Sequence, residues 1–307
     1  LTFRIVNKAL FSTGLQKEQL KRVDYIVTNL QKYVITMARQ PYLYPWLKLT
    51  GKIKFYESLR RETDDIVYGI IKERREQKSG YNDLLDMLIN SRYEDTGEGM
   101  NDKQLRDESM ILIVAGHETS ANALAWALYL ISQRPDVEQK LLQEAEAVLG
   151  NRTPTFEDLP NLQYTRQVIQ ETMRLYPPAR IIDRMALEDD EIDGYKIPKD
   201  KVILLFIYGT HHSPKYWSNP ETFNPDRFAK ENMKDLPNYA YFPFGGGPRL
   251  CIGNNFALFE MQIVLATLLR RFTFSLQPNH VIDLQPLVTL RPRYGVKMNI
   301  AQRVGAV

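Results

Sequence analysis

The stretch FPFGGGPRLCIGNNFA, residues 242–257, contains Cys251, the single cysteine in a chain of 307 residues. Three consecutive glycines precede this cysteine at 245–247, and Gly253 follows it. An apolar run with helical periodicity then covers residues 256–272. Because a lone cysteine cannot form a disulfide within its own chain, its position at the start of a predicted helix needs another explanation.

Metal binding is one explanation for this cysteine. A thiolate is a strong ligand for a soft metal, and the free N–H groups and dipole at a helix N-terminus stabilise it. The glycines allow the backbone to turn tightly and to approach a flat ligand closely. Arg249 lies two residues upstream, where it can pair with an anionic group on that ligand. The competing interpretation is a small buried hydrophobic residue, which is the more common role of a lone cysteine.

The composition is that of an ordinary globular protein, with 44% hydrophobic and 25% charged residues. The net charge is only +3, and the charges are spread along the chain without a basic block, so nucleic acid is not an expected partner. One cysteine in the whole chain excludes a disulfide framework and favours a reducing compartment.

Helices dominate the predicted secondary structure. Apolar spacings of three and four residues predict helices over 17–38 and from Ile53 onward, and further helices near 82–90, at 136–149 and at 162–176. Residues 193–210, DGYKIPKDKVILLFIYGT, predict a β-hairpin in which 202–207 form a buried strand. Short strands are expected near 273–277 and 295–300. The predicted fold class is therefore mainly α with a minor β-sheet.

The longest predicted helix covers residues 103–134, which contain no proline before Pro135. Such a helix is roughly 45 Å long at 1.5 Å per residue, enough to cross a whole domain. Its almost uncharged centre, 109–131, could also suggest a membrane span. However, polar residues at 116–120 lie in the middle, where a bilayer penalises them. We therefore expect a buried central helix and no membrane segment in this chain.

The pattern around the cysteine decides between the two interpretations. Phe244, Gly247, Arg249, Cys251 and Gly253 form F-x-x-G-x-R-x-C-x-G, which resembles the haem-binding signature of the cytochrome P-450 family. At roughly one in twenty per fixed letter, five letters match by chance about once in a few million starts. The signature alone is therefore a specific indication of this family.

Three further motifs follow the order of the same family. AGHETS, 115–120, is similar to the oxygen-groove segment of the family's long central helix. Glu171 and Arg174 match its E-x-x-R pair, and PDRF, 225–228, matches the segment in which Arg227 joins that pair. Singly these motifs are weak, since Glu and Arg three residues apart usually form a surface ion pair. Together and in order, they extend the resemblance over essentially the whole chain.

The resemblance implies a cytochrome P-450-like fold around a buried haem b, with dioxygen as co-substrate. Cys251 would be the axial thiolate ligand of the iron. Phe244 would pack beside the thiolate, and Gly253 would contribute to the same cofactor-binding loop. Arg249 and Arg184 would contact the two haem propionates.

The resemblance also assigns roles on the central helix. The small residues Ala115 and Gly116 would leave room for dioxygen above the iron. Glu118 and Thr119 resemble the acid–alcohol pair that relays protons to bound oxygen. The triad of Glu171, Arg174 and Arg227 would be structural and would hold the loop that presents the cysteine.

The substrate-binding residues are expected to be mainly apolar, which suits a lipophilic substrate. Arg180 would hold a carboxylate if the substrate were a fatty acid; alternatively, it points to solvent or to a propionate. His117 is not expected to bind iron, and His211 and His212 are expected to be loop residues rather than ligands. The positions that match the substrate lining of the family are Leu112, Ala179, Arg180, Ile181 and Ile182.

The resulting hypothesis is a haem-thiolate monooxygenase, with 1–307 as one catalytic domain that lacks the N-terminal part of the family. A peroxide-using or isomerising haem-thiolate enzyme and a non-catalytic haem sensor remain as alternatives, although neither needs the proton relay. Electrons are expected from a separate ferredoxin, flavodoxin or reductase, because no flavin or iron–sulfur segment is recognisable. A cytoplasmic location is expected, since the chain shows no anchor.

Overall fold

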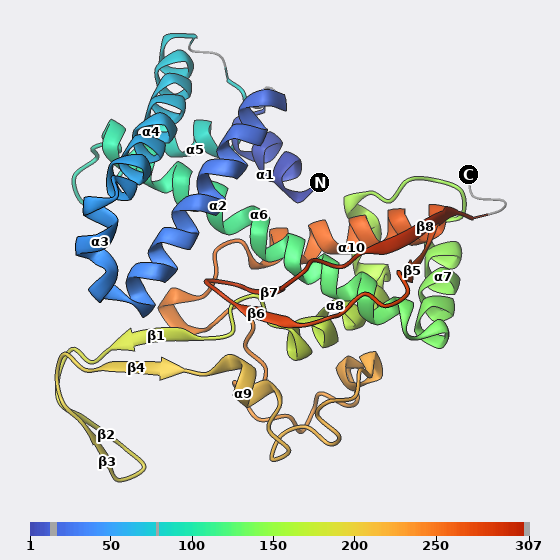
Figure 1. Cartoon of the computed structure of the whole chain (residues 1–307). Helices are drawn as coiled ribbons and strands as arrows, with labels where there is room; N and C mark the ends of the chain where they lie inside the picture. The colour runs from blue at the N-terminus through green and yellow to red at the C-terminus, as the bar shows by residue number, and fades with distance from the viewer. Residues whose placement is uncertain (13–16, 78–79, 304–307) are drawn as a thin grey trace. The chain divides into compact units, whose positions relative to one another are not determined.

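A computed structural model describes residues 1–12, 17–77 and 80–303 of the chain (Figure 1). Helices predominate and the sheets are small, which confirms the predicted fold class. The α-helices are α1 (Thr2–Phe11), α2 (Lys17–Arg39), α3 (Tyr44–Leu49), α4 (Lys52–Gln77), α5 (Leu84–Asn90), α6 (Asp102–Ser132), α7 (Pro135–Leu149), α8 (Gln163–Leu175), α9 (Ile207–His211) and α10 (Asn254–Arg271).

The long helix α6 agrees closely with its prediction. It begins at Asp102 and ends at Ser132, just before the proline that was expected to stop it. Within the described part of the chain, neither α6 nor any other helix combines the length and apolarity required to span a bilayer. Its polar centre thus distinguishes α6 from a membrane helix.

The chain divides into two compact units, Leu1–Glu118 and Thr119–Val307. Helix α6 passes from the first unit into the second without interruption. Because the sequence predicts one continuous helix through this point, it contains no signal for the division. The expectation of one catalytic domain over the whole chain stays a prediction.

The first unit has its own apolar core, formed by α1, α2, α4, α5 and the first half of α6. Leu10, Val23, Ile71, Leu85 and Leu105, one from each of these helices, are buried in one cluster. The same cluster also contains Val6, Val27 and Val67, each four residues from a member on the same helix, a spacing that places apolar side chains on one helix face. The amphipathic patterns of the sequence therefore correspond to a real core.

The second unit packs helices around α8. Trp126 of α6 is fully buried and stacks on Tyr176, with ring centroids 4.1 Å apart. On α10, Gln262 is buried and donates hydrogen bonds to the carbonyls of Leu159 and Leu162, at 3.2 and 3.1 Å. These bonds anchor α10, which follows the cysteine loop, to the segment that precedes α8.

The strands form two-stranded antiparallel sheets, and one predicted pairing is wrong. Strand β4 (Val202–Leu205) pairs with β1 (Ile182–Met185), whereas β3 (Tyr195–Ile197) pairs with β2 (Asp190–Ile192). Figure 1 shows β1 and β4 side by side, with the β2–β3 hairpin at their far end. Residues 193–210 therefore do not form one hairpin.

Strand β4 is also not buried as predicted. Val202 and Leu204 are each 61% exposed, because successive side chains of a strand point to opposite faces and only one face of this ladder is covered. The predicted C-terminal strands are confirmed as β5 (Phe272–Leu276) and β8 (Met298–Gln302), which pair with each other. The remaining pair is β6 (Leu284–Pro286) with β7 (Leu290–Pro292).

Candidate functional site

The cysteine loop is a tight backbone structure that depends on its glycines. Gly245 and Gly247 have φ values of 74° and 66°, in the region that side chains other than glycine rarely adopt. The Gly245 N–H donates to the Phe242 carbonyl at 2.9 Å, and the Cys251 N–H donates to the Phe244 carbonyl at 3.0 Å. The loop thus returns on itself and places Cys251 beside Phe244.

Cys251 lies three residues before the first residue of α10, Asn254, whose N–H donates to the Cys251 carbonyl at 3.4 Å. The cysteine is free and exposed. Its neighbours Leu250, Ile252 and Phe256 are apolar, and they are 50%, 92% and 40% exposed. An exposed cysteine with exposed apolar residues near it in the chain fits a ligand that combines a soft metal with a flat apolar body.

A cluster of protein ligands would be an alternative way to hold a metal. The described ranges 1–12, 17–77 and 80–303 contain no group of three or more His, Cys, Asp and Glu side chains that could do so. Since haem iron takes four ligands from its own ring, it needs only an axial ligand such as a thiolate from the protein. The exposed Cys251 can supply such a thiolate, and this donor fits haem as the ligand.

The structure brings the three residues of the predicted triad together. Glu171 and Arg174 are both fully buried; Arg174 Nε and Nη2 donate to the two carboxylate oxygens at 2.6 and 2.9 Å. Arg227 Nε lies 3.3 Å from Glu171 Oε1, which also accepts the Asn224 N–H at 2.9 Å. The pair is therefore no exposed surface ion pair; it joins α8 to the 224–227 segment.

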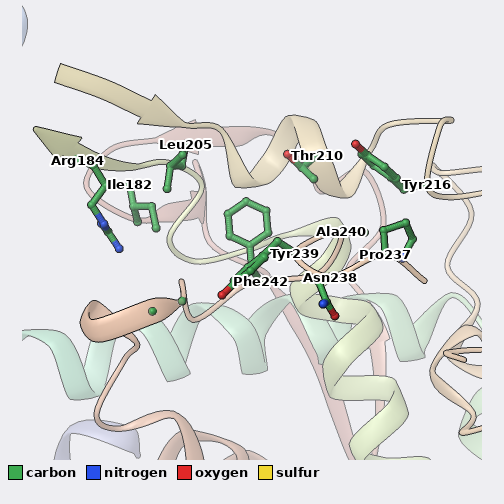
Figure 2. A pocket seen from close by; sticks show the side chains of 12 residues that line it. Ile182, Arg184, Leu205, Thr210, Tyr216, Pro237, Asn238, Tyr239, Ala240 and Phe242 are labelled. Carbon is green, nitrogen blue, oxygen red and sulfur yellow. The ribbon is translucent and has the colours of Figure 1, made fainter. Parts of the chain in front are cut away.

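A cavity of about 530 Å³ lies between the β1–β4 ladder and the segment that leads to the cysteine (Figure 2). Ile182 and Arg184 line it from β1, and Gly247 of the cysteine loop also belongs to its lining. Arg184 Nη1 donates to the neighbouring Asp183 carbonyl at 2.7 Å. The other lining residues are Leu205, Thr210, Tyr216, Pro237, Asn238, Tyr239, Ala240, Phe242 and Gly246.

Among the predicted residues of the first unit, Gly116 packs against α1. A Cβ atom at this position would lie 3.2 Å from both methyl carbons of Val6, so the glycine allows the two helices to approach. Ala115 is exposed and Leu112 is half-buried. This contact gives Gly116 a packing role of its own, and its place near dioxygen stays a prediction.

Glu118 has a partner that no sequence motif indicated. Gln31 of α2 donates from its side-chain nitrogen to the Glu118 carboxylate. The two residues are 87 positions apart, so no local spacing could have revealed this contact. Thr119 follows as the first residue of the second unit. Gln31 therefore orients the acid of the predicted proton relay.

His117, which lies between Gly116 and Glu118 in the chain, contacts other residues of the first unit. Its Nδ1 lies 3.0 Å from the Ile113 carbonyl, and its ring packs on Phe3 with centroids 4.7 Å apart. His211 and His212 were expected in a loop, but His211 is the last residue of helix α9. This expectation is wrong for His211 because the five-residue helix is too short to show a periodic pattern. His212 is the C-cap residue and lies in the turn after the helix, as expected.

The residues after the double proline, 179–182, lead from the segment after α8 into the first residue of β1. Ala179, Arg180, Ile181 and Ile182 are all half-buried. The Arg180 carbonyl accepts the Tyr208 N–H at 3.1 Å, which ties this segment to α9. Their contribution to substrate binding stays a prediction.

Comparison with known proteins now identifies the family. Residues 1–298 match the family described as Cytochrome P450. The chain belongs to the cytochrome P450 family. The solved heme domain of cytochrome P450DA superposes on 99% of the chain and 66% of that structure, with a TM-score of 0.90 and 27% identity. Membership in this family implies haem b, a cysteine thiolate ligand and dioxygen as co-substrate.

Several cytochromes P450 are similar in sequence. Putative cytochrome P450 132 of Mycobacterium tuberculosis is 36% identical over 83% of the chain and 54% of its own length. Cyclooctat-9-en-7-ol 5-monooxygenase of Streptomyces melanosporofaciens is 32% identical over 89% and 59%. Human cytochrome P450 3A7 is 36% identical over 80% and 50%. The chain thus spans between half and three-fifths of the length of these relatives.

Proposed function

We propose that the chain is the haem-thiolate domain of a monooxygenase that inserts one oxygen atom of dioxygen into a lipophilic substrate. The observation that carries this proposal is the exposed cysteine Cys251, whose backbone N–H donates to the Phe244 carbonyl within a glycine loop and whose sequence neighbours are exposed apolar residues. On this proposal, residues 1–307 act as one catalytic domain.

The haem-binding residues come from the loop and from β1. Cys251 would bind the iron through its sulfur, with Phe244 and Gly253 beside it. Arg249 and Arg184 would neutralise the two propionates, since guanidinium groups pair well with carboxylates. Bound haem supplies the site that activates dioxygen, and a thiolate ligand favours O–O cleavage.

The proton relay would use Glu118 and Thr119. Gln31 holds the Glu118 carboxylate, which supports a fixed position for the acid. Glu118 would then pass a proton to the Thr119 hydroxyl, which would donate it toward the oxygen site. Ala115 and Gly116 would keep this part of the helix free of bulky side chains.

The substrate would lie against Leu112, Ala179, Ile181 and Ile182, whose apolar side chains suit a lipophilic compound. Arg180 would bind the carboxylate if the substrate is a fatty acid. The relative named for cyclooctat-9-en-7-ol oxidises a lipophilic compound, which supports the substrate class. A separate ferredoxin, flavodoxin or reductase would deliver the electrons.

The absorption spectrum of the reduced, carbon-monoxide-bound protein tests the central claim. We expect the strongly red-shifted Soret band of thiolate coordination in the parent and its loss in Cys251→Ala. A histidine-type spectrum in the parent would overturn the proposal. Arg180→Leu tests the finer claim, which fails if long-chain acids bind this variant as tightly as they bind the parent.

A further inference from the structure

His211 is a buried histidine to which the proposed function assigns no role. It is 0% exposed at the end of α9, and its Nε2 lies 3.0 Å from the backbone nitrogen of Phe242. Because a peptide N–H can only donate, Nε2 must accept, and the ring proton must be on Nδ1. Nδ1 is buried and has no hydrogen-bond partner among the described residues.

The ring is held in its neutral form. Burial lowers the pKa of His211 to about 3, and the positive charge of Arg174 contributes to this lowering. Tyr241 stacks on the ring with centroids 5.2 Å apart, and the Tyr241 hydroxyl donates to the Gln170 carbonyl of α8 at 3.1 Å. The ring is therefore neutral and the acceptor at Nε2 is available at neutral pH.

The carbonyl of the same residue contacts the buried ion pair. Arg174 Nη1 donates to the His211 carbonyl at 2.8 Å, while Arg174 Nε holds Glu171. His211 thus touches the α8 ion pair with its backbone and the Phe242 N–H with its ring. His211 therefore links α8 to Phe242, at the start of the cysteine loop.

From Phe242 the hydrogen bonds continue to the cysteine. The Phe242 carbonyl accepts the Gly245 N–H at 2.9 Å, and the Phe244 carbonyl accepts the Cys251 N–H at 3.0 Å. A shift of the Phe242 peptide would therefore alter the turn that sets the position of Cys251. Such supporting contacts commonly determine how well a metal ligand is oriented.

We propose that His211 is a positioning residue that fixes the Phe242 peptide against α8 and thereby sets the place of the Cys251 sulfur. This inference rests on the proposed function, in which that sulfur binds the haem iron. An apolar core residue would fill the same space, but it would leave the partly buried Phe242 N–H without its acceptor. The acceptor at Nε2 is thus the property that distinguishes positioning from packing.

Three variants separate these two roles. His211→Phe keeps an aromatic ring against Tyr241 but removes the acceptor. His211→Gln places an amide oxygen near the former position of Nε2 and retains the acceptor. His212→Phe is the matched control, because His212 stacks on Tyr208, with centroids 4.0 Å apart, and bonds to the Tyr208 carbonyl rather than to the cysteine loop.

The first readout is the spectrum of the haem-loaded, reduced, carbon-monoxide-bound protein. We expect His211→Phe to lower the ratio of thiolate-bound to non-thiolate complex about fivefold, the effect of losing one buried hydrogen bond. His211→Gln should recover most of this ratio, and His212→Phe should match the parent. A parental ratio in His211→Phe, or equal losses in the Gln and Phe variants, would overturn the inference.

The second readout is amide hydrogen exchange, which does not depend on the iron. The Phe242 amide should be strongly protected in the parent and should exchange about tenfold faster in His211→Phe. An unprotected Phe242 amide in the parent would overturn the inference even if no variant folds. If Cys251→Ala retained the red-shifted band, the proposed function would fail, while protection of Phe242 would still report the His211 contact separately.

Discussion

Glu260 on α10 is a buried carboxyl group in the helix that follows the cysteine. The residue is only 5% exposed. Burial raises the pKa of Glu260 to about 7, and the Ser120 hydroxyl opposes this rise only in part. Among the described residues, neither carboxyl oxygen has a hydrogen-bond partner. The folded protein therefore keeps a proton on this side chain at pH values where the unfolded chain has already released it.

This difference predicts a pH-dependent stability. Below pH 4.5 the Glu260 carboxyl group is protonated in both the folded and the unfolded state. As the pH rises from 4.5 to about 7, the unfolded state loses this proton first, so the free energy of unfolding should fall. The loss is about 3 kcal/mol at most, from 1.36 kcal/mol per pKa unit. Glu260→Gln should lack this loss, which urea denaturation at pH 5 and pH 8 can measure.

The exposed Glu57 of α4 provides the control for this measurement. Glu57→Gln should keep the parental decrease in stability between the two pH values, because an exposed carboxyl group gains little from folding. If Glu260→Gln lost as much stability as the parent between pH 5 and pH 8, the assignment of the pH dependence to Glu260 would be wrong.

For single residues, the sequence predicted the features that depend on residues nearby in the chain. The glycines near Cys251 indicated a tight turn, and Gly245 and Gly247 have positive φ. Contacts between distant residues gave no such signal. The contact of His211 with Phe242 is one example, because the two residues are 31 positions apart in the chain.

Three helices of the first unit are joined by one buried ion pair. Arg74 of α4 donates from Nη1 to both carboxylate oxygens of Asp83 at 2.8 Å, and from Nη2 to the Phe11 carbonyl of α1 at 3.0 Å. Asp83 also accepts the Asp86 N–H at 2.9 Å as the N-cap of α5. Removing either charge would leave the other buried without its counter-ion.

Arg74→Leu should therefore destabilise the protein by about 3–5 kcal/mol, the typical cost of an uncompensated buried charge. Lys72→Ala is the control on the same helix, because the Lys72–Glu76 pair is 77% and 67% exposed. That change should cost less than about 1 kcal/mol. Chemical denaturation measures both variants, and equal losses would show that burial of the Arg74–Asp83 pair is not the cause.

Helices were more predictable than strand pairings. The bounds of α6, α7 and α8 follow from apolar periodicity and from prolines, which are local signals. Strand β4 was recognised as a strand, but its partner β1 lies on the other side of the β2–β3 hairpin. A short apolar run does not specify which strand it pairs with, so the predicted hairpin was wrong.

The family could be recognised from the sequence because its motifs are short and lie far apart in a fixed order. The same motifs contain little information on how the chain divides into Leu1–Glu118 and Thr119–Val307, since α6 is uninterrupted there. A short motif identifies residues of a functional site, whereas the division into compact units depends on packing between residues far apart in the chain.

Haem should also act as a structural ligand of the whole protein. Leu250, Ile252 and Phe256 expose apolar surface beside Cys251, and a bound macrocycle would remove such surface from water. A ligand at 100 times its dissociation constant stabilises the folded state by about 2.7 kcal/mol. The midpoint of thermal unfolding should therefore be higher with haem than without it. Cys251→Ala should show a smaller increase because it lacks the iron–sulfur bond, and equal midpoints with and without haem in the parent would contradict a haem site at this loop.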